Sequence, residues 1–192
     1  MLHLLFRLAA LQLAAFQFGV QGDDQFAPAP LAFAQWPVLF PFFKWVDGTG
    51  MSTYIKATTW VFPFTETIHI LALAVLLGSV FLIDLRLLGV AEKRWSPAQI
   101  MEQVRSLMNW SVGIILVTGV FLFIAEPRKL FDNGAFGPKM LLLALALIFQ
   151  YAFYPSVRKM QTSIPIWGRI MALISFGLWF GVAVCGRAIG FV

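Results

Sequence analysis

The chain has 192 residues, of which 60% are hydrophobic and 12% are charged, and its mean hydropathy is +0.82. These values indicate an integral membrane protein and exclude an ordinary soluble domain. The formal net charge of +5 comes from cations in short loops between apolar segments. We interpret these cations as topology determinants and lipid contacts, not as a nucleic-acid surface. The single cysteine, Cys185, excludes an intrachain disulfide.

Residues 1–50 are predicted to form a signal-like and interfacial segment with a linker. A positive start and an apolar run at residues 8–20 are typical of a signal peptide or a signal anchor. Ala32-Phe-Ala34 has the small-x-small form of a cleavage site, so retention and removal of the preceding residues are both open. Aromatic residues, a lysine and prolines mark residues 31–46 as an interfacial segment rather than a span.

Residues 51–192 hold four apolar runs of the kind that cross the ~30 Å hydrocarbon core as helices. They cover about residues 58–83, 99–124, 139–154 and 166–189. Short connections require antiparallel neighbours, so we predict an all-α fold, an integral membrane four-helix bundle. The loops after the first and third runs carry slightly more Lys and Arg than the opposite side, which favours placing these two loops in the cytoplasm.

Glu66 and His69 are the first candidate site residues. Three positions apart near the start of the first run, they lie on nearly one face of a helix. A carboxylate and an imidazole are costly in hydrocarbon, so we expect both to face the bundle interior. His69 is then a haem or metal ligand with Glu66 as co-ligand or supporting group, or the two form a proton relay. The structural alternative is a hydrogen bond between them, or from each to a neighbouring helix.

Arg187 is the third candidate. It lies near the end of the last run, and antiparallel spans bring it to the same membrane side as Glu66, where the two could pair. We therefore predict that His69, Glu66 and Arg187 bind a cofactor and that His69 is the metal ligand. No catalytic constellation of residues is recognisable.

The histidine count limits any haem b or metal site, because the only other histidine is His3. A second haem ligand would otherwise be a water, His69 of a second subunit, or one of Met108, Met140, Met160, Met171, Lys139 and Cys185. A zinc or copper site with two or three histidines needs a partner chain.

Three further features have plain structural interpretations. Asp84 and Arg86, at the end of the first run, do not face each other, and we interpret them as interfacial charges that extend toward the headgroups, with pairing to other helices as the alternative. Gly177 and Gly181, four residues apart, permit close helix packing or leave room for a flat cofactor, and we favour packing. Lys139, at the start of the third run, is interpreted as a lipid contact or as a group that binds an anionic ligand.

Four motifs together resemble a family of small bacterial membrane proteins, the domain of unknown function DUF6644. They are Phe62-Pro63-x-x-Glu66-x-x-His69, Asp84-Leu-Arg86-Leu-Leu-Gly89, Phe136-x-x-Lys139 and Gly186-Arg187-x-Ile-Gly190. The resemblance covers about residues 56–192 and implies a multi-pass protein of the bacterial inner membrane, with no established reaction. A looser similarity, through the in-span histidine and Phe136-x-x-Lys139, connects the chain to copper-resistance D-like and cytochrome-b-like membrane domains. The chain lacks the second in-span histidine of the b-type pattern.

These observations favour a redox-associated membrane subunit with a buried Glu/His site for a haem, a metal, a quinone or a proton relay. Whether it is an enzyme stays open, and a non-catalytic or electron- or proton-transfer subunit is favoured. We expect it to work in a homo-oligomer or with other membrane subunits. A structural anchor for a partner complex and a small transporter or channel subunit are the alternatives. The middles of the second and third runs are nearly all apolar, which argues against a wide aqueous path.

Overall fold

The structure, a computed structural model, describes residues 36–90, 94–160 and 164–190. All regular elements in these residues are helices, which confirms the all-α prediction. A 3₁₀ helix (η2, Pro37–Leu39) precedes α2 (Phe40–Asp47), α3 (Gly50–Ala57), α4 (Val61–Leu87), α5 (Pro97–Ala125), α6 (Pro127–Asp132), α7 (Phe136–Val157) and α8 (Ile166–Ala188). The apolar run at residues 8–20 and the cleavage-like Ala32-Phe-Ala34 lie outside the described residues.

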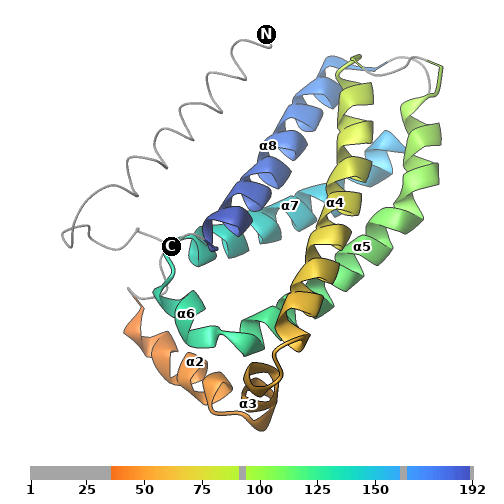
Figure 1. Cartoon of the computed structure of the whole chain (residues 1–192). Helices are drawn as coiled ribbons and strands as arrows, with labels where there is room; N and C mark the ends of the chain where they lie inside the picture. Colours follow the sequence, from red (N-terminus) through yellow and green to blue (C-terminus); the bar gives the residue numbers. More distant parts are fainter. Residues whose placement is uncertain (1–35, 91–93, 161–163, 191–192) are drawn as a thin grey trace.

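Four of these helices, α4, α5, α7 and α8, are long and apolar enough to cross a membrane. The protein is therefore a multi-pass membrane protein, as the four apolar runs predict. Figure 1 shows α4 beside α5 and α7 beside α8, and these two pairs have the most extensive contacts. Contacts between α4 and α8 join the pairs into one bundle.

Local sequence explains where the membrane helices begin and end. The Ser96 hydroxyl accepts from the Gln99 backbone amide at 3.2 Å and the Gln99 side chain accepts from the Ser96 amide at 2.8 Å, a capping box that starts α5. At the end of α4, Gly89 has φ of +79° and donates to the Arg86 carbonyl at 3.1 Å. The Val90 amide donates to the Leu85 carbonyl at 3.1 Å, which completes a Schellman motif. The glycine of the Asp84–Gly89 motif is thus a helix stop.

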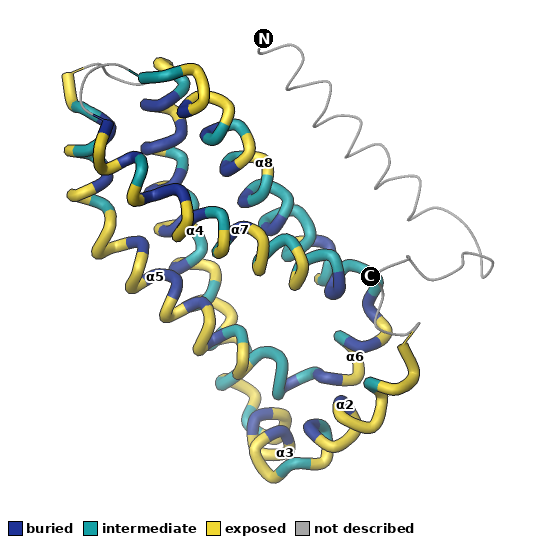
Figure 2. The backbone as a smooth tube through the Cα atoms, turned by 180° about the vertical axis from the view of Figure 1, so that it is seen from behind, coloured by how far each residue is buried: buried dark blue, intermediate teal, exposed yellow. Residues whose placement is uncertain are grey.

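Burial divides each long helix into an inner and an outer side, as the tube in Figure 2 shows. The inner sides of the four spans form one cluster that includes Leu76, Ile83, Met108 and Trp179, each at most 1% exposed. The outer sides carry large apolar residues, with Trp110 73% exposed. An apolar outer surface of this extent is the expected lipid contact of a membrane bundle.

The small residues of α8 have the structural role that their spacing predicts, at one of the two positions. A Cβ built on Gly181 would lie 3.1 Å from Leu142 Cδ1, so the absence of a side chain lets α8 approach α7 closely. A Cβ on Gly177 would meet nothing within 4 Å.

A layer of short helices lies across the end of the bundle where α4 begins (Figure 1). Phe43 and Phe131 are buried in it, with ring centroids 5.1 Å apart, and Phe123 of α5 packs on Phe43 at 5.3 Å. Together with Phe136 at the start of α7 they form an aromatic cap, the name we use for these four residues. Since α2 packs against α6, the described part of the first fifty residues lies against the bundle rather than apart from it.

Candidate functional site

His69 is fixed by a hydrogen bond to the neighbouring helix. Its Nδ1 lies 2.8 Å from Thr118 Oγ1 of α5. The Thr118 hydroxyl also lies 2.6 Å from the Ile114 carbonyl oxygen, which can only accept. The hydroxyl has one hydrogen and donates it to that carbonyl, so the bond between the side chains requires His69 Nδ1–H as donor. In the neutral ring, His69 Nε2 then carries a lone pair that is available to a ligand or a proton.

The sequence around Thr118 shapes the contact. Gly119 follows it, and a Cβ built there would lie 3.6 Å from His69 Cε1, so the α5 backbone lies beside the imidazole. Thr118 is 8% exposed, which places its bond with His69 inside the bundle. Away from water, such a bond holds both the orientation and the tautomer of the ring.

Lys139 is a charged residue that lies close enough to the His69 imidazole to interact with it electrostatically. It lies in the first turn of α7, half-buried, within electrostatic range of both His69 and Cys185. A Cβ on Gly186 of α8 would lie 3.6 Å from Lys139 Cε and 3.7 Å from Nζ. The lysine stem therefore runs along the α8 backbone instead of extending into lipid.

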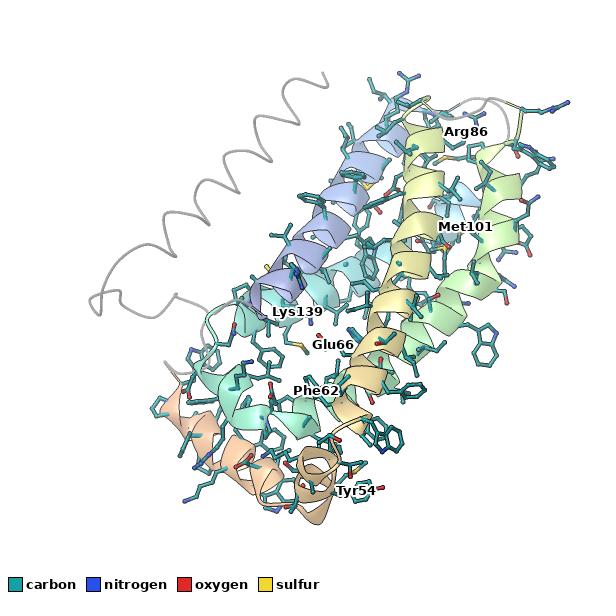
Figure 3. The ribbon with its side chains drawn as sticks, viewed as in Figure 1. Tyr54, Phe62, Glu66, Arg86, Met101 and Lys139 are labelled. Carbon is teal, nitrogen blue, oxygen red and sulfur yellow. The ribbon has the colours of Figure 1, made fainter. Side chains whose placement is uncertain are left out.

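Glu66 does not join His69. The carboxylate is exposed, and no hydrogen bond or ion pair joins Glu66 to another described residue. The 27 residues of α4 span about 40 Å, longer than the ~30 Å hydrocarbon core, so its first turns reach the interface. Glu66 lies only about 8 Å along the helix axis from the first residue of α4. It lies near the end of the span, and Figure 3 shows it at the same end of the bundle as Lys139.

Arg187 is at this end too, exposed in the last turn of α8. The three candidates therefore lie toward the same end of the bundle, but among the described residues no hydrogen bond or ion pair joins Glu66 to His69 or to Arg187. No group of three or more His, Cys, Asp and Glu residues there could hold a metal ion.

The bundle narrows the possible second haem ligands. Lys139 and Cys185 share the His69 end. Met108 precedes Thr118 by ten residues on α5, about 15 Å along the helix axis, and Met160 packs on Gly168 at the far end. Of the side chains considered from the sequence, Lys139, Cys185 and Met140 lie at this level of the bundle, and Met140 is 43% exposed.

A family model for DUF6644, described as a family of unknown function, matches residues 42–192. The chain belongs to the DUF6644 family. The match begins within α2, before the boundary predicted at residues 50 and 51. No curated protein and no solved structure matches the chain.

Thr118 was not recognisable from the sequence as part of the site, whereas Lys139 was considered as a lipid contact, a second haem ligand or a group that binds an anionic ligand. Thr118 is an ordinary span residue until the relative register of α4 and α5 is known. Lys139 follows a Gly-Pro turn, a pattern typical of an interfacial lysine. The structure shows instead that the Lys139 side chain lies against the α8 backbone at Gly186.

The interpretation of Asp84 and Arg86 as interfacial charges is wrong. They are 2% and 5% exposed, and Arg86 Nε donates to the Trp95 carbonyl at 2.7 Å, tying the end of α4 to the loop before α5.

Proposed function

We propose that this protein is a redox-associated membrane subunit that binds a haem or a quinone head group through His69. The observation that supports the proposal is the hydrogen-bonded Nδ1, which leaves the Nε2 lone pair of a positioned imidazole inside a membrane bundle. A histidine held in this way by a second group is the usual form of a haem or metal ligand. The loose similarity to cytochrome-b-like domains points in the same direction.

The surrounding residues fit either ligand. A haem would be held by His69 Nε2 together with Lys139 or Cys185, and it would supply the electron-transfer chemistry. For a quinol, Nε2 accepts a hydrogen bond or a proton from one hydroxyl, and the Lys139 ammonium donates to the other oxygen. In both cases the apolar core, which begins at Ala72 on α4, would limit the access of water to the ligand. Glu66, at the interface, exchanges protons with solvent.

We further propose that the subunit works in a homo-oligomer or with other membrane subunits of the bacterial inner membrane. One in-span imidazole provides half of a bis-histidine site, and a second copy or a partner would provide the other half.

The experiment is to purify the full-length protein from membranes in mild detergent. The preparation is then analysed by absorption spectroscopy in oxidised and reduced forms, by iron content, and by solvent extraction of quinones. We expect one ligand per chain or per oligomer, lost in His69→Ala and kept in Asp84→Asn, which alters a buried acid on the same helix. A preparation without haem or quinone, or a His69→Ala variant that keeps its ligand, contradicts the proposal.

A structural anchor for a partner complex is the second candidate, because the His69–Thr118 bond also ties α4 to α5. In that case a stoichiometric partner co-purifies with a ligand-free chain, and His69→Ala still retains the partner.

A further inference from the structure

Three side chains at the other end of the bundle have buried polar atoms that lack a hydrogen-bond partner among the described residues. Asp84 and Gln150 are each 2% exposed and Tyr154 is 8% exposed. Asp84 Oδ2, both polar atoms of the Gln150 amide and the Tyr154 hydroxyl have no hydrogen-bond partner among the described residues. An unsatisfied buried polar atom lowers the stability of the folded state by about 1–3 kcal/mol. Four such atoms in one bundle therefore indicate a bound molecule that forms hydrogen bonds with them.

The helices bring these groups to one level. The Ser175 side chain of α8 contacts the Asp84 carboxylate of α4, and the same carboxylate is within electrostatic range of Tyr154 of α7. On the antiparallel pair of α7 and α8, Gly181 faces Leu142. Six residues back from Gly181 is Ser175, and six residues on from Leu142 is Ile148, so Ser175 and Gln150 differ by two residues in level.

Gln150 and Tyr154 lie one turn apart on the same buried face of α7. The long Tyr154 side chain leans toward the start of its helix, and therefore toward Gln150. The helices α4, α7 and α8 thus surround one polar region, on the side of Tyr154 that faces the start of α7.

Among the described residues, no cation forms an ion pair with Asp84. Arg86, two positions on, donates to the Trp95 carbonyl. Facing groups are Ser175 from α8 and Tyr154, with Tyr151 beyond it, from α7. The buried residues of α5 at this end, Met101 and Met108, are apolar. An ionised carboxylate in such surroundings is far more costly than a protonated one.

The donor and acceptor character of the four atoms indicates which kind of molecule can bind there. Asp84 Oδ2 and Gln150 Oε1 are acceptors, whereas Gln150 Nε2 is a donor and the Tyr154 hydroxyl does both. A bare cation would satisfy the acceptors but would face the hydrogens of Gln150 Nε2. Water donates two hydrogen bonds and accepts two, so it complements both kinds of atom.

We propose that α4, α7 and α8 enclose an internal hydration site in which ordered water bridges Asp84, Gln150 and Tyr154, and in which the Asp84 carboxyl holds an exchangeable proton. The site uses none of the atoms of the His69 end, so it stands whether or not a redox ligand binds there. It gives the conspicuous Asp84 of the Asp84–Gly89 motif a role inside the membrane, that of a proton-binding group.

Infrared spectroscopy of the full-length protein in liposomes tests this. At neutral pH we expect a carboxylic-acid carbonyl band that Asp84→Asn removes and that Glu102→Gln, a change at an exposed carboxylate, leaves in place. Transfer to D₂O should shift the band, since water reaches the proton. Gln150→Met should shift it too, because the bridging hydrogen bonds change.

The opposite results overturn the proposal. Absence of any band sensitive to Asp84→Asn means that the carboxyl is ionised. A band that D₂O does not move after prolonged exchange means that the site is dry, and a band unaffected by Gln150→Met means that no water joins the two residues. Circular dichroism and gel filtration of each variant show that it folds.

Discussion

The two ends of α4 bury polar groups in opposite ways. His69 has its Nδ1 bonded to Thr118, and every polar atom of that contact has a partner inside the bundle. Asp84 lies 15 residues on, about 22 Å along the axis, beside polar atoms that have no partner among the described residues. At the His69 end, the hydrogen bonds with Thr118 hold the imidazole and leave Nε2 for a ligand. At the Asp84 end, the unpaired polar atoms need a bound molecule as hydrogen-bond partner.

The largest effect is expected at the satisfied end. Thr118→Val keeps the shape of the side chain but leaves His69 Nδ1–H buried without an acceptor, so we expect a loss of about 1–3 kcal/mol in unfolding free energy. Reversible unfolding in mixed micelles measures it. The control is Thr67→Val, because Thr67 is exposed and its hydroxyl bonds only the Pro63 carbonyl of its own helix. Equal losses in the two variants would contradict the assigned role of Thr118.

The next effect concerns the helix stop beside Asp84. Gly89→Ala forces a side chain into the left-handed region and should cost about 1–2 kcal/mol. Gly78→Ala is the matched control: Gly78 lies within α4 with nothing near its Cβ position, so alanine there should stabilise by about 0.5–1 kcal/mol. If both variants change stability in the same direction, the Schellman motif does not hold this end.

At the unsatisfied end we expect a smaller change. Gln150→Met has a similar volume and removes two polar atoms that have no partner in the described chain, so unfolding free energy should change by less than about 1 kcal/mol. The same unfolding assay measures it beside Thr118→Val. A loss as large as that of Thr118→Val would remove the contrast between the two ends.

The smallest effect is expected in the layer below His69. Asp47 pairs with Lys56 and, at 3.6 Å, with Arg128, all on the solvent side of the short helices. Asp47→Asn should cost about 0–1 kcal/mol and less at high salt, because exposed ion pairs are weak and screened. A larger, salt-independent cost would show that this layer contributes more to stability than its surface pairs suggest.

Hydropathy and helix length were sufficient to predict the four spans, because lipid requires every backbone group to be satisfied within a helix. The inner and outer sides were harder to assign. Glu66 and His69 share a helix face, yet Glu66 is exposed whereas His69 is half-buried and bonded to Thr118. Asp84 and Arg86 look like interfacial charges in sequence, and only helix packing shows that they are buried. Thr118 and Lys139 depend on the register between helices, which no local pattern contains.

The tautomer of His69 is the central claim, and nitrogen NMR of the protein with ¹⁵N-labelled histidine tests it most directly. The chain has two histidines, so His69→Gln assigns the signals. We expect a protonated Nδ1 and an unprotonated Nε2 in His69, with the Nδ1–H signal moved by Thr118→Val. A proton on Nε2 and none on Nδ1 would contradict the account, because the atom assigned to the ligand would then be a donor.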